Sequence, residues 1–562
     1  MLCVDPCALI IRFATRRVGD RPHGSEHRPM QQDSAAASRA TPADTKQIRH
    51  LRQILLWPVH LLPLKEEAPL QHHWEHLAPD PTNPWRELDD EFGDPGEFQE
   101  RHYNEFVTFL PPVQRFLYGQ GIGRAVRRSY GESPIRVMRR SDIASVRLTL
   151  DKGAAPIELK IIHVDLYFFF DIDIAILALE VAADDIELGV AQEALFRFGR
   201  AYPAYWEQDC RGGHCPWLVE WLSPKGETLA RSDYERREKY LSFVCQHRAP
   251  AVASHWEFLL SPLVLHHSDR RGLVRYRQLE YYRMPYMAFF AMENPSVLTR
   301  PDLIRMGIGN EAGASSELPY SESYLGEFEE RFCYDRYCDA HLGKQVTGTR
   351  FMCTGHTLVV IGEAKDRFFM NADGGFLGRF RHQHFLLFLV AHFQRAALHM
   401  FSDRLVAAVS KLDITDAEAN RVFRRDIRHA LENFLRFEHR YWFYEISNQA
   451  QARELYAMTR EHLALDALYR DIREERRHGK LPRRGGNAAA ERNRGAADRG
   501  HHLWPDRHGV HWVPRHESAG VGRPSARTAG SGVLRRDRRH HDLDRLHRGQ
   551  ISPPVRVFRR AL

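Results

Sequence analysis

The sequence predicts an α+β protein in which a largely antiparallel sheet with flanking helices is followed by long stalk-like helices and a disordered C-terminal tail. Three observations predict this class. Strand-like segments precede a helical segment between residues 106 and 202, helical periodicity prevails from residue 382, and all periodicity stops after residue 478. With 562 residues and 43% hydrophobic composition, the chain can bury a large core in more than one structural unit.

The sheet is predicted from apolar runs. IRVMRR (135–140) and SVRLTL (145–150) are typical of short strands, and IELKIIHVDLYFFF (157–170) and DIAILALEV (173–181) of longer ones. ELGVAQEALFRFGRAY (187–202) has helical spacing. Four strands followed by a helix favour an α/β layer with a mostly antiparallel sheet.

Two further segments follow this layer. TRFMCTGHTLVVIGEA (349–364) indicates a β-hairpin, because two apolar runs flank a turn that contains Gly355. The aromatic segment YRQLEYYRMPYMAFFAM (276–292) is interpreted as helical in patches. The middle of the chain, to about residue 330, is therefore expected to be helical and aromatic.

Two long helices are predicted at the end of the ordered part. The first spans residues 382–411, and Thr415-Asp-Ala-Glu418 forms a capping box that starts the second. There is no Gly or Pro from Thr415 to His478, which allows one unbroken helix of about sixty residues, roughly 90 Å long at 1.5 Å per residue. Such lengths are common in stalks and coiled coils. Its apolar face comprises Ile427, Leu431, Phe434, Phe437, Leu465, Leu468 and Ile472.

Composition divides the chain into four regions. Residues 1–46 lack a sustained pattern and are predicted to be disordered, or to be an over-long extension with the initiator at Met30. Residues 47–380 form the predicted α/β domain, and residues 381–478 a long helical hairpin and stalk. Residues 479–562 form a basic tail.

The net charge of +7 is unevenly distributed. Residues 476–562 hold 21 basic and 7 acidic residues, a net of +14, whereas residues 1–475 hold 59 and 66, a net of −7. The basic character therefore belongs to the tail alone.

The cysteines and the apolar runs bear on the compartment. Eight cysteines are sparse for this length, and no secretory signal precedes them, which favours a reducing, cytoplasmic setting. The longest uncharged apolar run, FLLFLVAHF (385–393), is less than half of the ~20 residues that a membrane-crossing helix needs. The chain as written is therefore predicted to have no transmembrane segment. Its cysteines are Cys3, Cys7, Cys210, Cys215, Cys245, Cys333, Cys338 and Cys353.

Two clusters contain the soft ligands that a zinc site requires. One pairs Cys210 with His214 and Cys215, and the other is Cys333 with Cys338 and His341. Neither spacing matches a common finger or ribbon, so free thiols are the favoured interpretation.

Other candidate motifs are also weak. Gly119, Gly121 and Gly123 resemble half of a dinucleotide loop, but the third glycine comes too soon for the pyrophosphate turn. Asp171 and Asp173 would share one face of a strand, where paired acids could exchange protons, although a solvated face is favoured. Packing or surface roles are favoured for four histidines of the first long helix, His382, His384, His392 and His399.

No nucleophile elbow, P-loop, HExxH or kinase signature occurs in the sequence. An enzyme is therefore not expected, and no cofactor is predicted.

Two segments and the long helix carry a family resemblance. RHYNEFVTFLPPVQRFLYG (101–119) and FEHRYWFYEISNQAQARELYAMTREHLALDALYRDIREE (437–475) make the chain similar to the cytoplasmic part of bacterial CorA-like membrane proteins. In that family an α/β domain leads into a stalk helix, a first transmembrane helix that ends in Gly-Met-Asn, and a second transmembrane helix. The resemblance covers roughly residues 47–475, and the motif Gly-Met-Asn is absent from this chain.

A frameshift would account for both the missing motif and the unpatterned tail. Shifted forward by one nucleotide with permitted synonymous codons, residues 497–517 can read LTVVTTFGLIGTVFTGFLGMN, so that Arg515, His516 and Glu517 stand over Gly-Met-Asn. Residues 529–549 can read LALVFFAVTAATTTLTVYTVV, and Gln550 onward can read KSRRLSEFFDAL. Upstream of the first span, Arg477 onward can read ADMASYLDAVATQRQNATVVR. Because wobble positions permit many apolar choices, the order of the parts is more informative than their hydrophobicity.

The resemblance implies a divalent-cation transport protein, with magnesium as the expected transported and regulatory ion. It also implies a homopentamer in the bacterial inner membrane, of which this chain would be the cytoplasmic regulatory part. In the family, cytoplasmic Mg²⁺ bridges carboxylates of neighbouring subunits. The stalk candidates for this role are Glu454, Glu461, Asp466 and Asp471.

The alternative is a soluble protein whose basic tail binds nucleic acid or an acidic surface. Its support is the +14 tail, in which Trp504 and Trp512 could stack on bases. The acidic body and the near-absence of lysine from the tail argue against it, so nucleic acid is not the favoured partner.

Overall fold

The computed structural model describes residues 46–64, 71–77, 83–88, 99–119, 134–279, 282–313, 318–337, 348–413 and 415–478. These residues belong to one compact unit, Met1–Gly486. The predicted N-terminal extension, apart from Lys46, and the basic tail lie outside the described residues.

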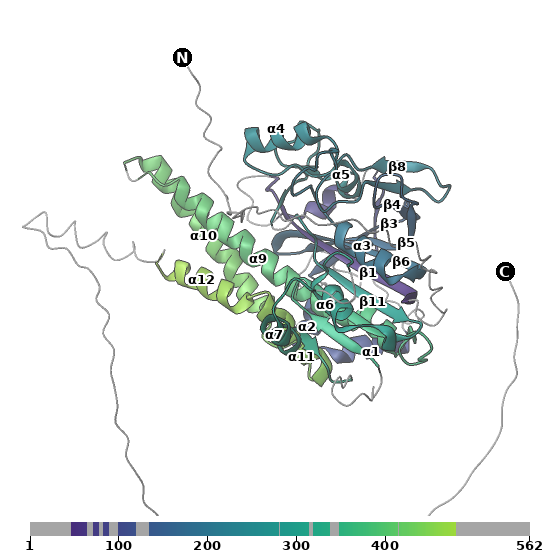
Figure 1. Ribbon diagram of the computed structural model, residues 1–562. Coiled ribbons are helices and arrows are strands. Elements are labelled where there is room, and N and C mark those ends of the chain that lie inside the picture. The colour runs from purple at the N-terminus through teal and green to yellow at the C-terminus, as the bar shows by residue number, and fades with distance from the viewer. Residues whose placement is uncertain are drawn as a thin grey trace, which may run out of the picture. The chain divides into compact units, whose positions relative to one another are not determined.

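One mixed sheet organises the described residues (Figure 1). Its main path runs β12-β13-β14-β11-β1-β6-β5-β4-β7-β8. Of its thirteen described pairings only β9 with β10 and β11 with β14 are parallel, so the predicted antiparallel character is confirmed. The strands are β1 (Gln47–Leu61), β2 (Trp85–Glu87), β3 (Ile135–Arg140), β4 (Ser145–Thr149), β5 (Ile157–Phe169), β6 (Ile172–Glu187), β7 (Leu218–Leu222), β8 (Thr228–Arg231), β9 (Val264–Leu265), β10 (Arg275–Gln278), β11 (Tyr286–Met292), β12 (Cys333–Tyr334), β13 (Arg350–Cys353) and β14 (Thr357–Glu363).

Helices lie against both faces of this sheet (Figure 1). They are α1 (Glu100–Thr108), α2 (Pro111–Tyr118), α3 (Leu188–Arg197), α4 (Arg237–His247), α5 (Ser254–Leu260), α6 (Arg300–Ile308), α7 (Glu322–Phe332), α8 (Phe376–Arg379), α9 (Phe385–Ser410), α10 (Ala417–Arg440), α11 (Ala450–His462) and α12 (Leu465–His478).

The central strand β1 supplies side chains to two separate hydrophobic cores. Leu55 and Trp57 belong to one core, whereas Ile54 and Leu56 belong to the other. This division follows from the alternation of side chains along a strand. A strand that is apolar on both faces must be covered on both sides, which is why the protein has two helical layers.

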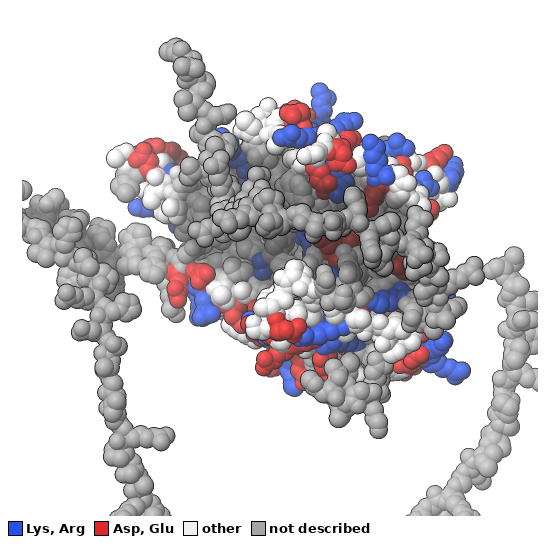
Figure 2. Space-filling model, viewed as in Figure 1, with Lys and Arg blue, Asp and Glu red and all other residues white. Residues whose placement is uncertain are grey.

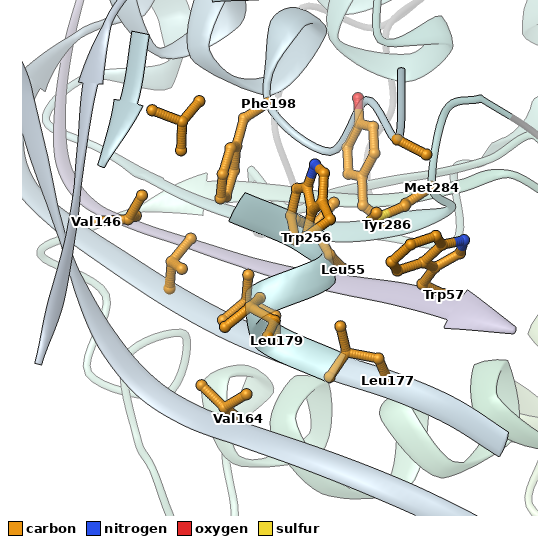
Figure 3. Close-up of a cluster of buried hydrophobic side chains, with 14 of the residues drawn as sticks. Leu55, Trp57, Val146, Val164, Leu177, Leu179, Phe198, Trp256, Met284 and Tyr286 are labelled. Atoms are coloured by element: carbon orange, nitrogen blue, oxygen red, sulfur yellow. The ribbon is translucent and has the colours of Figure 1, made fainter. Parts of the chain in front are cut away.

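The first core lies under α3 and α5. Figure 3 shows Trp57 and Trp256 beside Leu177 and Leu179 of β6. The two indole rings meet edge to face, with centroids 6.1 Å apart and an interplanar angle of 69°. Aromatic pairs of this geometry add about 0.5–1.5 kcal/mol beyond the area that they bury.

The second core is built around α9. Phe393 of this helix is fully buried, and its ring stacks on Phe169 at the end of β5 with centroids 3.9 Å apart. Phe116 of α2 and Tyr441 also pack on Phe393. The predicted helix at 382–411 is therefore confirmed as α9, which begins at Phe385. Residues 382–384 belong to a π-helical turn that spans residues 380–384.

Within the described residues one helical stretch, Phe376–Ser410, is long and apolar enough to cross a membrane. Its apolar window is 78% buried inside the protein. Burial against the sheet accounts for this apolar character, as expected for a core helix of the chain as written.

The predicted strands and the β13–β14 hairpin are confirmed, but the middle of the chain differs from prediction. Residues 276–292, interpreted as helical in patches, contain β10 and β11 instead. All seven residues of β11 are buried, because it lies between β1 and β14 with a core on each side. A strand buried on both faces has no polar alternation, so its periodicity cannot be distinguished from that of a helix.

The unbroken helix of about sixty residues is a wrong prediction. The chain leaves α10 after Arg440, begins α11 at Ala450, and turns again at Ala464, which has a left-handed φ of 52°. Neither break contains Gly or Pro. Burial of Tyr441, Trp442 and Phe443 in the second core provides the free energy for the first break.

The start of α10 also differs from the predicted capping box. Asp416, rather than Thr415, is the N-cap, and its carboxylate accepts from the Glu418 amide. Thr415 instead donates its hydroxyl to Asp413 at 2.6 Å. The Asp413 carboxylate also accepts from the Thr415 amide, so the threonine is not available to the helix.

Candidate functional site

The part of the fold that corresponds to the predicted hairpin and stalk is a helical arm, which we define as residues 402–440 of α9 and α10 together with α12. α9 and α10 form an antiparallel pair whose connecting end lies away from the sheet, and α12 runs beside them (Figure 1). The candidate stalk carboxylates lie on α12 of the arm and on α11, the helix that precedes it.

Two aspartates at the start of β6 anchor the arm to the sheet. Asp171 accepts hydrogen bonds from the Arg440 guanidinium and, at 2.6 Å, from the Tyr441 hydroxyl. Asp173 accepts from Arg404 of α9. The favoured solvated strand face is therefore wrong for Asp171, which is 4% exposed because it lies in the turn beneath the end of α10.

A continuous apolar seam holds α12 against the hairpin. Ile472 of α12 lies with Phe401 and Leu405 of α9 and with Ala430, Leu431 and Phe434 of α10 around one small cavity. One turn earlier, Tyr469 stacks on Trp442 with ring centroids 4.4 Å apart. The Tyr469 hydroxyl donates to Glu438 of α10. The seam fixes the direction in which α12 runs along the arm.

Two of the four predicted carboxylates are engaged within the chain. Glu454 of α11 accepts from the Tyr334 hydroxyl at 2.5 Å and lies 3.5 Å from Arg336. Burial raises the pKa of Tyr334 to about 12, so its hydroxyl stays protonated and keeps donating. Asp466, in the first turn of α12, accepts from the Arg460 guanidinium. A cation would have to displace these partners.

The other two predicted carboxylates are exposed. Glu461 is near the end of α11, and Asp471 lies on the outer side of α12. Within the described residues neither forms an ion pair. Glu461 and Asp471 are therefore the two candidate carboxylates that have no ion-pair partner among the described residues.

Within the described part of the chain, no group of three or more His, Cys, Asp or Glu side chains could hold a metal ion. Cys210 is exposed and Cys215 is buried, so the two thiols of the first predicted cluster lie in different environments. Burial raises the pKa of the Cys215 thiol to about 12, which keeps it protonated. Cys338 and His341 of the second cluster lie outside the described residues.

The remaining sequence motifs have structural positions. Gly119 follows α2 with a φ of 78°, and Gly121 and Gly123 lie outside the described residues. His384 and His392 are buried packing residues, as predicted. His382 lies 3.1 Å from the Glu105 carboxylate, and His399 is half-buried.

One important residue has no signal in the sequence. Arg460 is 5% exposed, and its guanidinium lies over the rings of Trp442, Tyr444 and Tyr456 at 4.7, 5.2 and 5.7 Å. It also donates to the Phe443 carbonyl. By joining the α10–α11 connection to Asp466, it fixes both breaks in the predicted long helix. Only the folded chain brings these partners together.

No family model, curated protein or solved structure matches this chain. Any function must therefore be argued from the residues and their geometry.

Proposed function

We propose that the chain is the cytoplasmic regulatory part of a CorA-like divalent-cation transport protein of the bacterial inner membrane, with magnesium as the ion. Hydrated Mg²⁺ gives up its water reluctantly and is conducted past polar oxygens at a pore mouth. The residues of the pore mouth would be encoded by the forward-shifted frame. The chain as written is therefore not expected to conduct ions.

The observation that carries the proposal is the order of parts in the forward-shifted frame. That frame can encode a helical continuation, an apolar span that ends in Gly-Met-Asn, a second span, and a basic end. A basic cytoplasmic end agrees with the positive-inside tendency of membrane proteins. Wobble choices readily supply hydrophobicity, whereas this order of parts is harder to obtain by choice.

The helical arm supports the same proposal. α12 is the last described element and ends at His478. The proposed frame break, at Arg476 or Arg477, falls in its last turn. Its apolar side, which includes Leu465, Tyr469 and Ile472, packs on α9 and α10, so a helix continuing in the same direction would leave the body along the arm. A stalk needs such an exit from the body.

The nucleotide sequence across codons 470–562 is the first test. We expect the forward frame to be open and to encode two apolar spans separated by Gly-Met-Asn. Stop codons in that frame, or the absence of either span, would remove the main support for the proposal.

A transport assay is the second test. The restored-frame gene should rescue growth of a bacterium lacking its magnesium transporters in low magnesium, whereas the chain as written should not. Replacement of the Asn of the restored Gly-Met-Asn by Ala should abolish rescue while leaving membrane insertion intact. Full rescue by the chain as written would contradict the proposal.

Regulation can be tested in the same restored protein. Because Glu461 and Asp471 are exposed, Glu461→Gln combined with Asp471→Asn should weaken inhibition by cytoplasmic magnesium several-fold without destabilising the body. Glu418→Gln, at the exposed start of α10, is the matched control and should leave inhibition unchanged. Equal inhibition of the restored protein, the double variant and the Glu418→Gln control would exclude Glu461 and Asp471 from the inhibition by magnesium.

The alternative, a nucleic-acid-binding protein, has a separate test. Figure 2 shows Lys and Arg interspersed with Asp and Glu over the visible described surface, which is not the single-sign stripe that nucleic acid selects. Salt-sensitive DNA binding by the chain as written that disappears on truncation after Glu475 would favour the alternative. Weak binding with or without the tail would count against it.

A further inference from the structure

A basic pocket lies where the end of α4 meets β9 and β10, apart from the candidate stalk carboxylates. It has a volume of about 340 Å³. This is within the range of ~300–1,000 Å³ that is typical of small-molecule sites. Ten residues line it, five of which carry basic nitrogens and none of which is acidic. The basic five are His247, Arg248, His266, His267 and Arg277.

Three separate elements bring these nitrogens together. His247 ends α4 and Arg248 caps it, His266 and His267 follow β9, and Arg277 lies in β10. The rings of His247 and His267 are stacked at 5.0 Å with an interplanar angle of 6°, and those of His266 and His267 are 3.8 Å apart. The three imidazole rings contact one another, and the guanidiniums of Arg248 and Arg277 carry the permanent positive charge of the pocket.

The positive charges of the pocket are incompletely balanced. Asp403 of α9 lies 3.2 Å from Arg277, and both side chains are about half exposed. Arg248 is exposed and has no ion-pair partner within the described residues. Burial, together with the neighbouring positive groups His267 and Arg277, lowers the pKa of His266 to about 4. Additional negative charge at this position would therefore be stabilising.

Two buried polar atoms at the pocket have no hydrogen-bond partner in the described structure, Nδ1 of His266 and Oε1 of Gln278. Phe243, Pro250 and Leu265 supply apolar lining beside the basic groups, with the Phe243 ring 4.6 Å from that of His247. A ligand that suits this lining has an oxyanion at one end and an apolar ring at the other.

We propose that this pocket binds a small organic oxyanion, a phosphate or carboxylate carried on an apolar ring. Arg248 and His267 would contact the oxyanion, and Phe243 and Leu265 would contact the ring. This site is independent of the proposed transport function, because none of its residues belongs to the candidate stalk carboxylates or to the seam of α12.

The test is calorimetric titration of the full chain at constant ionic strength with phenyl phosphate, benzoate and phenol as probes. Phenyl phosphate or benzoate should give saturable binding, and whichever binds more tightly identifies the oxyanion. Phenol, which has the ring without the charge, should bind at least tenfold more weakly. Equal binding of phenol and both anions would overturn the proposal, as would the absence of saturable binding by either anion.

Two substitutions locate the binding. Arg248 and His267 have left-handed φ values of 53° and 67°, a conformation that Asn tolerates, so Arg248→Asn and His267→Asn should both keep the fold. Each should weaken binding of the preferred anion about tenfold, a loss of one charge-assisted contact. Arg237→Asn, exposed at the start of α4, is the matched control and should bind like the parent chain. Unchanged affinity in both pocket variants would overturn the assignment.

A second readout does not depend on substitutions. An anion beside the histidine cluster favours the protonated imidazoles, so binding should take up protons and should tighten as the pH falls from 7.5 to about 6.5. Titration in two buffers with different heats of ionisation measures this uptake. Zero proton uptake would place the anion elsewhere on the protein.

Discussion

The two halves of α9 differ in what surrounds them. In the first half, Phe388 and Phe393 are both 0% exposed within the second core, whereas Val406 and Val409 in the second half are 62% and 57% exposed. The same helix is thus a core element at one end and part of the arm at the other. The difference shows that the arm shares the second core at its base and is exposed toward its tip.

The largest effect is expected in the first half of α9. Phe393→Ala should lower the free energy of unfolding by about 4 kcal/mol, because it removes a fully buried ring from contact with Phe169, Phe116 and Tyr441. Urea unfolding at pH 7 measures the change. A loss below about 1 kcal/mol would mean that this half is not core.

The anchor between body and arm should give the next largest effect. Asp171→Asn leaves the Arg440 guanidinium without its buried partner and should cost about 3 kcal/mol in the free energy of unfolding. Asp184→Asn, in β6, removes an exposed partner of His50 in β1 and should cost less than about 1 kcal/mol. Equal losses in the two variants would contradict the anchor.

A pH effect is expected from the body. Burial lowers the pKa of His384 to about 3. The unfolded value is about 6.5. The folded state thus binds this proton less readily, and the associated stability is present above pH ~6.5 and is lost as the pH falls toward 3.

The variant His384→Gln tests this linkage. Between pH 6.5 and 5, its free energy of unfolding should fall by about 1.6 kcal/mol less than that of the parent chain, because the linkage slope approaches about 1.4 kcal/mol per pH unit only below pH 6.5. Urea titrations at those two pH values give the slopes. Parallel slopes would show that His384 does not titrate on unfolding.

The smallest effect is expected in the second half of α9. Val409→Ala should change the free energy of unfolding by less than about 0.5 kcal/mol, because the side chain is 57% exposed. Urea unfolding under the conditions used for Phe393→Ala gives a direct comparison. A loss above 1 kcal/mol would show that a partner covers the arm in solution.

Local sequence patterns were sufficient to predict the elements that have amphipathic or strand-like spacing. β3, β4, β5, β6 and α3 could be predicted from apolar runs and turn signals. β11 could not, because complete burial on both faces removes the alternation that distinguishes a strand. The breaks after Arg440 and at Ala464 also escaped prediction, since neither contains a helix-breaking residue.

The candidate carboxylates show the same limit. Charge and position along the predicted stalk could select Glu454, Glu461, Asp466 and Asp471 as a group. They could not separate Glu454, held by Tyr334, from the exposed Glu461, because that contact joins residues 120 positions apart in the chain. The basic pocket was missed for the same reason.

The α+β class, the apolar strands, the helical end of the ordered part and the charge contrast between body and tail follow from composition and short-range periodicity, which are local properties of the chain. The breaks in the long helix, the burial of Asp171 and the exposure of two of the candidate carboxylates follow from packing in the folded protein. Those outcomes depend on contacts between distant segments, such as Arg460 with Trp442 and Asp171 with Arg440, whose free energies exceed local helical preference.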